Sequence, residues 1–137
     1  MIQEDIDLLL QDLCGRIPYG VKCEVYDRIG VLDEISSYGA AVNYDNGEDT
    51  TCRIEYIKPY LFPLSSMTKE QKKFFDDKNI ECDGWEIVSK EGSHYQSCYT
   101  DIEEWLEVID WLNKNHFDYR GLISRGLAID ATGLNIY

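Results

Sequence analysis

Apolar residues recur at helical spacing in two parts of the chain. Residues 2–14 place isoleucines and leucines every three or four positions, with acidic residues between them, and this pattern predicts an amphipathic helix. Gly15 follows, and glycine readily adopts the left-handed conformation at a helix end. A second helical pattern opens with a capping box at residues 100–103 and continues to residue 115. We expect this second helix to pack on a sheet through Trp105.

Between these helices the pattern changes to short runs typical of strands. Strands are predicted at residues 21–26, 30–35, 40–44 and 50–57. Asn46 and Gly47 separate the last two and favour a tight hairpin turn. Consecutive short strands predict an antiparallel meander, which either closes into a small barrel similar to the SH3 type or stays open beneath the helices. The alternation of Cys52, Ile54 and Tyr56 with charged residues predicts one buried face for the last strand.

The segment that contains Pro59 and Pro63 is apolar. Because proline cannot donate a ladder hydrogen bond, we expect this segment to wrap the domain rather than form a central strand. A capping box at residues 68–71 predicts a surface helix over residues 69–78. One further strand is expected at residues 85–88.

These elements predict one α+β domain spanning residues 1–137, in which an N-terminal helix and two later helices pack against an antiparallel sheet or a small SH3-like barrel. The composition is that of a folded domain, because 44% of the residues are hydrophobic and 12% are aromatic. A chain of 137 residues can bury a substantial core without disulfide bonds or a structural metal. Its five cysteines include no C-x-x-C pattern and are expected to be reduced thiols.

The chain carries 26 acidic and 13 basic residues, a formal net charge of −13. Nucleic-acid binding draws most of its free energy from Lys and Arg side chains that neutralise phosphates, so we predict no direct binding to DNA or RNA. The negative charge also argues against binding to anionic membrane surfaces. No apolar run approaches the roughly 20 residues that a helix needs to cross a bilayer. The first residues are acidic and lack a signal-peptide pattern, so we expect a cytoplasmic protein.

Two groups of polar residues are candidates for chemistry. His116, Asp118 and Arg120 follow the second long helix, and an imidazole can perform acid–base chemistry when a carboxylate fixes its tautomer. The structural alternative is that Asp118 and Arg120 cap backbone groups or pair with each other while neighbouring aromatic rings fill the core. His94 and Cys98 are a weaker candidate, since a thiol protease also needs an orienting residue and an oxyanion hole.

We predict no cofactor and no metal. The spacing of Cys82, Asp83, His94 and Cys98 matches no zinc pattern. The sequence also lacks the glycine-rich loops that bind phosphates. The acidic run at residues 45–49 lacks the calcium-loop pattern and indicates a hairpin tip instead.

Pro59, Tyr60, Phe62 and Met67 are candidates for a partner-binding surface. Apolar side chains on an irregular segment either cover a sheet edge or form a docking surface for another protein. The most basic stretch of the chain follows directly, at residues 69–78. We therefore predict that the partner is another protein.

Three stretches of the sequence resemble a known family. They are residues 18–22 (PYGVK), 57–68 (IKPYLFPLSSMT) and 110–123 (DWLNKNHFDYRGLI). Together they span nearly the whole chain and resemble small uncharacterised proteins of gut Bacteroidetes and of their phages and other mobile elements. That family has no established activity, so the resemblance implies a bacterial or phage cytoplasmic setting and transfers no catalytic residue.

Three functional hypotheses follow from the sequence. The first is a non-enzymatic protein-interaction module or accessory factor of bacterial or phage origin, which binds its partner through an acidic face or through residues 59–67. The second is a small hydrolase or transferase that uses His116, Asp118 and Arg120. The third is an acidic decoy that occupies the site of a nucleic-acid-binding protein, although the lysines of residues 69–78 argue against it.

Overall fold

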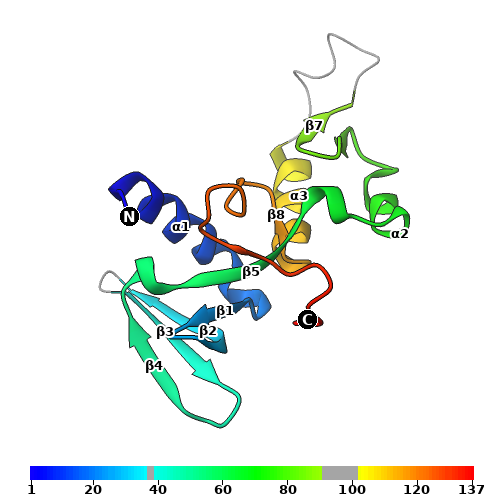
Figure 1. Cartoon of the computed structure of the whole chain (residues 1–137). Helices are drawn as coiled ribbons and strands as arrows, with labels where there is room; N and C mark the ends of the chain where they lie inside the picture. The colour runs from blue at the N-terminus through cyan, green and yellow to red at the C-terminus, as the bar shows by residue number, and fades with distance from the viewer. Residues whose placement is uncertain (37–38, 91–101) are drawn as a thin grey trace.

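The computed structural model describes residues 1–36, 39–90 and 102–137 and has a mixed α+β fold (Figure 1). The helices of these ranges are α1 (Gln3–Arg16), α2 (Lys69–Lys72) and α3 (Ile102–Lys114). Single turns of 3-10 helix are η1 (Ile17–Tyr19), η2 (Ile54–Tyr56), η3 (Leu64–Ser66) and η4 (Lys73–Phe75). The strands are β1 (Lys22–Val25), β2 (Arg28–Ser36), β3 (Gly39–Tyr44), β4 (Asp49–Cys52), β5 (Lys58–Pro63), β6 (Ile80–Cys82), β7 (Ile87–Ser89), β8 (Phe117–Asp118) and β9 (Ile129–Asp130). The predicted α+β class is confirmed.

The main sheet remains open in the part of the chain that is described. Its strands follow the order β4-β3-β2-β1-β5-β8, and β9 also pairs with β5. Strands β1 to β4 form the predicted antiparallel meander, and the Gly47 N–H donates to the Tyr44 carbonyl at 3.1 Å in the predicted hairpin turn. β5 is antiparallel to β1 but parallel to β8 and β9. Of the two predicted arrangements, the open sheet is the one observed.

β5 is a central strand, so the prediction that this segment wraps the domain is wrong. Pro59 and Pro63 are its second and last residues, and the residues between them supply backbone donors. The Phe62 N–H, for example, donates to the His116 carbonyl at 2.8 Å. In Figure 1, β5 runs from the meander at lower left toward α3. β5 therefore connects the β1–β4 meander to the part of the molecule that contains α3.

The central position of β5 buries the side chains that were candidates for a partner surface. Tyr60 and Met67 are 5% and 6% exposed. Pro59 is also buried, and Phe62 is half-buried between neighbouring elements. These side chains therefore belong to the packed interior and do not form an exposed docking surface.

The end of α1 differs from the prediction. The helix continues past Gly15 to Arg16, and the left-handed residue is Gly20, which follows η1. Gly15 instead lies where α1 approaches α3, because a Cβ atom at this position would be 3.0 Å from Asn113 Nδ2. The glycine permits a close contact between two helices rather than the end of one.

β4 ends earlier than predicted. Residues Ile54–Tyr56 form η2, which places Ile54 in the core and leaves Tyr56 54% exposed. Successive residues of a 3-10 helix are rotated by about 120°, so residues two apart point to different sides. The residues whose alternation predicted a strand with one buried face therefore form a single turn of 3-10 helix. The Tyr56 ring lies 6.2 Å from the ring of Tyr26.

The later elements are shorter than the sequence pattern suggests. The predicted capping box of α2 is present, with Thr68 Oγ1 accepting from the Gln71 N–H at 3.1 Å. The helical region ends at Phe75, however, and not at residue 78. The strand expected at residues 85–88 is confirmed only in part: β7 covers residues 87–89 and pairs with β6 in a small second sheet, whereas residues 85 and 86 lie in the loop before it. The capping box predicted at residues 100–103 lies partly outside the described residues.

Two hydrophobic clusters form the interior. The first joins α1 to the meander, and the second joins α3 to the β6–β7 hairpin, η3, η4 and β8. α3 buries Val108 and Leu112 completely in the second cluster, whereas Trp105 is half-buried. Ile102 and Leu106, from the predicted apolar face of this helix, are 72% and 58% exposed. Only part of that apolar face is therefore packed.

Gly30 marks a close approach between β2 and β3. A Cβ atom there would lie 2.4 Å from Val42 Cγ1 and 2.8 Å from the Asn43 carbonyl oxygen. We expect Gly30→Ala to lower the free energy of unfolding by roughly 2–3 kcal/mol through overpacking, measured by urea denaturation.

Gly47→Ala is the control for this prediction. A Cβ atom at Gly47 meets nothing within 4 Å, so only the positive φ of 84° opposes the substitution. That conformation costs an L-residue about 1 kcal/mol. Equal losses for the two variants would contradict the steric account of Gly30.

Candidate functional site

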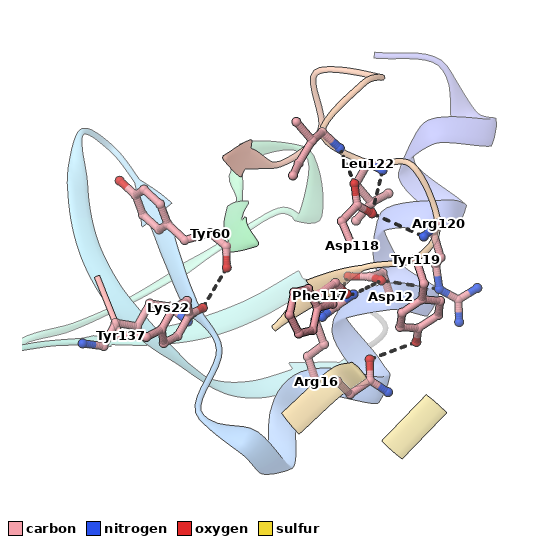
Figure 2. Close-up of polar contacts among 12 residues, drawn as sticks. Asp12, Arg16, Lys22, Tyr60, Phe117, Asp118, Tyr119, Arg120, Leu122 and Tyr137 are labelled. Atoms are coloured by element: carbon pink, nitrogen blue, oxygen red, sulfur yellow. Dashed lines mark hydrogen bonds and ion pairs between the residues drawn. The ribbon is translucent and has the colours of Figure 1, made fainter. Parts of the chain in front are cut away.

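An ion pair within α1 is fully buried. Asp12 and Arg16 lie one turn apart, and both side chains are 0% exposed. Arg16 Nε donates to Asp12 Oδ2 at 2.7 Å, and Arg16 Nη2 donates to Asp12 Oδ1 at 3.1 Å. Nη2 also donates to the Phe117 carbonyl at 2.7 Å (Figure 2). The guanidinium group thus ties α1 to β8.

Tyr119 lies close to two guanidinium groups. The Cζ atoms of Arg16 and Arg120 are each 5.2 Å from its ring centroid. Arg120 Nε also lies 3.4 Å from Asp12 Oδ1. The Tyr119 hydroxyl donates to Oδ1 of the buried Asn113 at 2.9 Å. We call these five residues the arginine cluster, and they join α1, α3 and the segment after β8.

Asp118 holds the turn that follows it. Its Oδ1 accepts from the Leu122 N–H at 2.9 Å and from the Arg120 N–H at 3.3 Å, and its Oδ2 accepts from the Ile123 N–H at 2.9 Å. A carboxylate is an acceptor only, and this one is 8% exposed. Its oxygens are therefore used by backbone donors, as Figure 2 shows.

His116 has a different set of neighbours. Its ring stacks on Tyr137, with centroids 3.6 Å apart and planes 9° apart. Its backbone is left-handed, with φ of 63°, and its Nδ1 atom is buried without a hydrogen-bond partner. Burial, and to a smaller extent the positive charges of Arg16 and Lys22, lower the pKa of the imidazole to about 4. The ring is therefore neutral near pH 7.

The structure does not bring the three predicted catalytic side chains together. In the described part of the chain, no hydrogen bond or ion pair joins His116 to Asp118 or to the side chain of Arg120. Arg120 contacts Asp118 only through its backbone N–H. A catalytic histidine needs a partner that fixes its tautomer. The geometry provides no such pair and agrees with the structural alternative for this segment.

The cysteines offer little nucleophilic chemistry. The described cysteines are free thiols at Cys14, Cys23, Cys52 and Cys82. Burial raises the pKa of the Cys23, Cys52 and Cys82 thiols, which disfavours the reactive thiolate. His94 and Cys98 lie outside the described residues. Within the described ranges, no group of three or more His, Cys, Asp or Glu side chains is placed to hold a metal ion.

An apolar cleft of about 240 Å³ lies beside the arginine cluster. Its lining includes Leu64, Trp85, Tyr119 and Ile123. Trp85 sits at the tip of the β6–β7 hairpin and is 85% exposed, although tryptophan side chains are highly buried on average. The sequence pattern predicts a strand at residues 85–88 and therefore does not indicate the exposure of Trp85. The Asp-Gly dipeptide before it was the available signal, since that pair marks hairpin turns.

Comparisons with family models, with curated proteins and with solved structures gave no match for this chain. Among the helices that the structure describes, none is long and apolar enough to cross a membrane.

The buried ion pair leads to a prediction about stability. We expect Arg16→Met to lower the free energy of unfolding by about 3–5 kcal/mol, because the buried Asp12 carboxylate loses its closest partner. The double variant Asp12→Leu, Arg16→Met should recover most of this loss, since it leaves no unpaired carboxylate. Both values come from urea unfolding followed by circular dichroism.

Arg125→Met serves as the matched control, because it removes a more exposed ion pair, 3.1 Å between Arg125 Nη1 and Asp5 Oδ1. Pairs of this kind contribute about 0–1 kcal/mol. A loss for Arg16→Met no greater than the loss for Arg125→Met would show that the buried pair is not a main support of the fold.

His116 should make stability depend on pH. The unfolded chain binds a proton at the ordinary histidine pKa of 6.5, whereas the folded protein does so only near pH 4. Stability is therefore lost as the pH falls from about 6.5 to about 4. We expect His116 to account for a loss of roughly 1–2 kcal/mol in the free energy of unfolding over this pH range, because partial solvation of the ring reduces the effect of the pKa shift.

The contribution is measured as the difference between the unfolding free energies of the wild type and of His116→Asn across this pH range. Asparagine does not titrate and tolerates the left-handed backbone. The difference should be constant above about pH 7, where histidine is neutral in both states. Two curves that stay parallel down to pH 4 would refute the assignment.

Proposed function

We propose that this protein is a non-enzymatic protein-interaction module, an accessory factor of bacterial or phage origin, whose contact surface is built around Trp85. The observation that carries the proposal is the 85% exposure of this indole beside an apolar cleft. Tryptophan is enriched among the residues that dominate binding free energies at protein interfaces. The bacterial or phage setting rests on the family resemblance of residues 57–68 and 110–123.

The cleft beside Trp85 suits a single apolar side chain of a partner. Leu64 and Ile123 contribute apolar lining, and Tyr119 contributes an aromatic ring. Tyr119 is held by the Asn113 amide and by the guanidinium groups near it. A wall fixed before binding loses little conformational entropy when the partner arrives. The cleft is thus preformed for an anchor residue of the partner.

Charge specifies the chemistry of the partner. Asp83 and Glu86 flank Trp85 at the hairpin tip and are exposed, and the whole chain has a net charge of −13. Complementary charge steers association and suppresses wrong partners. We infer that the partner presents an apolar or aromatic anchor flanked by Lys or Arg.

The test compares three baits made from the full chain: wild type, Trp85→Ala and Tyr56→Ala. We expect Trp85→Ala to reduce capture of a specific partner from host lysate at least about tenfold, as is typical of hot-spot residues. The free energy of unfolding should change by less than about 0.5 kcal/mol, because the side chain is exposed. Tyr56→Ala removes another exposed aromatic residue and should leave capture unchanged.

Washes at about 0.1 M and about 1 M salt separate the interaction types, because the Debye length falls from roughly 10 Å to roughly 3 Å. A protein with basic and apolar surface that both wild type and Tyr56→Ala retain, and that Trp85→Ala loses, supports the proposal. Identical partner lists for Trp85→Ala and wild type contradict it. Nucleic-acid-binding proteins that leave all three baits at high salt would favour the decoy hypothesis instead.

A further inference from the structure

β5 changes partners along its length. The first residues of β5 pair with β1, and the last of these pairs is Pro59 with Cys23. The end of β5 pairs with β8, beginning at Phe62. The antiparallel register would place Lys22 opposite Tyr60 as the next pair, but the described ladder stops before this position. One rung between the two neighbouring strands is therefore left for another group.

The hydroxyl of Tyr137 occupies this rung. The Lys22 N–H donates to the Tyr137 hydroxyl at 2.8 Å, and that hydroxyl donates to the Tyr60 carbonyl at 2.8 Å (Figure 2). A phenol has one O–H donor and can accept at the same oxygen, which is what the gap requires. Burial of this group raises the pKa of Tyr137, so the hydroxyl keeps the proton that it donates.

The Tyr137 side chain is 42% exposed, and aromatic rings cover part of its ring. The imidazole of His116 stacks on it at 3.6 Å, and the Phe62 ring lies 5.9 Å away at a tilt of 52°. Lys22 Nζ lies 5.9 Å from the ring centroid. Backbone donor, backbone acceptor, aromatic walls and a cation together form a receptor for a para-substituted phenol. We call it the phenol slot, formed by Lys22, Tyr60, Phe62 and His116.

The segment that carries Tyr137 has few other attachments. Residues 132–135 are exposed, and Lys22 Nζ donates to the Ile136 carbonyl at 2.7 Å. Two further hydrogen bonds of this segment are local: the Thr132 N–H donates to Asp130 Oδ1 at 2.9 Å and the Leu134 N–H to the Ala131 carbonyl at 3.1 Å. Asn135 has a left-handed backbone with φ of 54°, a conformation that asparagine tolerates and that ends any regular element at this point. Residues 132–137 can therefore leave the slot without disrupting a helix or strand.

We propose that the phenol slot is an exchangeable binding site for a tyrosine side chain. Tyr137 fills it within the chain, and a tyrosine of a partner protein fills it when residues 132–137 are released. The site selects phenol over benzene chemistry, because a ring without a hydroxyl leaves the Lys22 N–H and the Tyr60 carbonyl without partners. This site is separate from the Trp85 surface and does not depend on it.

The probe for the slot is p-cresol, the side chain of tyrosine without its backbone. We expect p-cresol at about 10 mM to raise the melting temperature of Tyr137→Ala by at least about 3 °C, because a ligand that binds only the folded state stabilises it. Toluene, which lacks the hydroxyl, should produce a smaller shift. Tyr56→Ala removes an exposed tyrosine outside the slot and should show no shift with p-cresol beyond that of the wild type.

A second variant keeps the test decisive if Tyr137→Ala does not fold. Tyr137→Phe retains the ring on His116 but leaves the two backbone groups of the slot unpaired. We expect p-cresol to bind Tyr137→Phe at least about tenfold more tightly than the wild type, followed through the Lys22 amide resonance. Equal affinities for these two proteins, or equal shifts with toluene and p-cresol in Tyr137→Ala, would overturn the proposal.

A peptide with the sequence of residues 132–137 distinguishes a polypeptide tyrosine from a free small phenol. Added to Tyr137→Ala, it should compete with p-cresol and shift the same Lys22 resonance. Binding of p-cresol without binding of the peptide would assign the slot to small phenols and would overturn its role in tyrosine exchange.

Discussion

The buried guanidinium group of Arg16 is the constraint on which the arrangement of this protein depends. A cation removed from water is tolerated only when charges and acceptors surround it. Asp12 supplies the charge, and the Phe117 carbonyl supplies an acceptor from a distant part of the chain. α1 therefore cannot slide along β8 without breaking the hydrogen bond from Arg16 Nη2 to the Phe117 carbonyl, which would leave a buried acceptor unpaired. The same requirement brings Tyr119 beside the guanidinium and connects it through Asn113 to α3.

Once β8 is positioned, β5 acquires a second set of partners, and the two hydrophobic clusters become parts of one framework. Leu61 belongs to the first cluster, whereas Phe62 packs against the second. The neighbouring His116 carbonyl accepts from β5, so its ring is held where it meets Tyr137. Residues that resembled a catalytic group in the sequence thus have positions that follow from the assembly of the sheet.

The sequence predicted features that depend on near neighbours. The period of α1, the turn at Asn46 and Gly47, and the capping box at Thr68 are set by residues a few positions apart. The central placement of β5 was not predictable, because its partners β8 and β9 are two residues long and carry no periodic signal. The ion pair between Asp12 and Arg16 was not predicted, because the predicted helix ended before Arg16 and the burial of the two side chains depends on β8.

The parallel pairing of β5 also has a consequence during protein synthesis. Tyr60 pairs with Ile129 and Phe62 with Phe117, so these contacts wait until most of the chain has left the ribosome, whereas the β1–β4 meander needs only residues already made. During that interval β5 is an open apolar edge that other nascent chains can join. Pro59 and Pro63 bracket this edge and remove two of the donors that such misassembly would use. The prolines that made this segment look unlike a central strand protect it until its proper neighbours arrive.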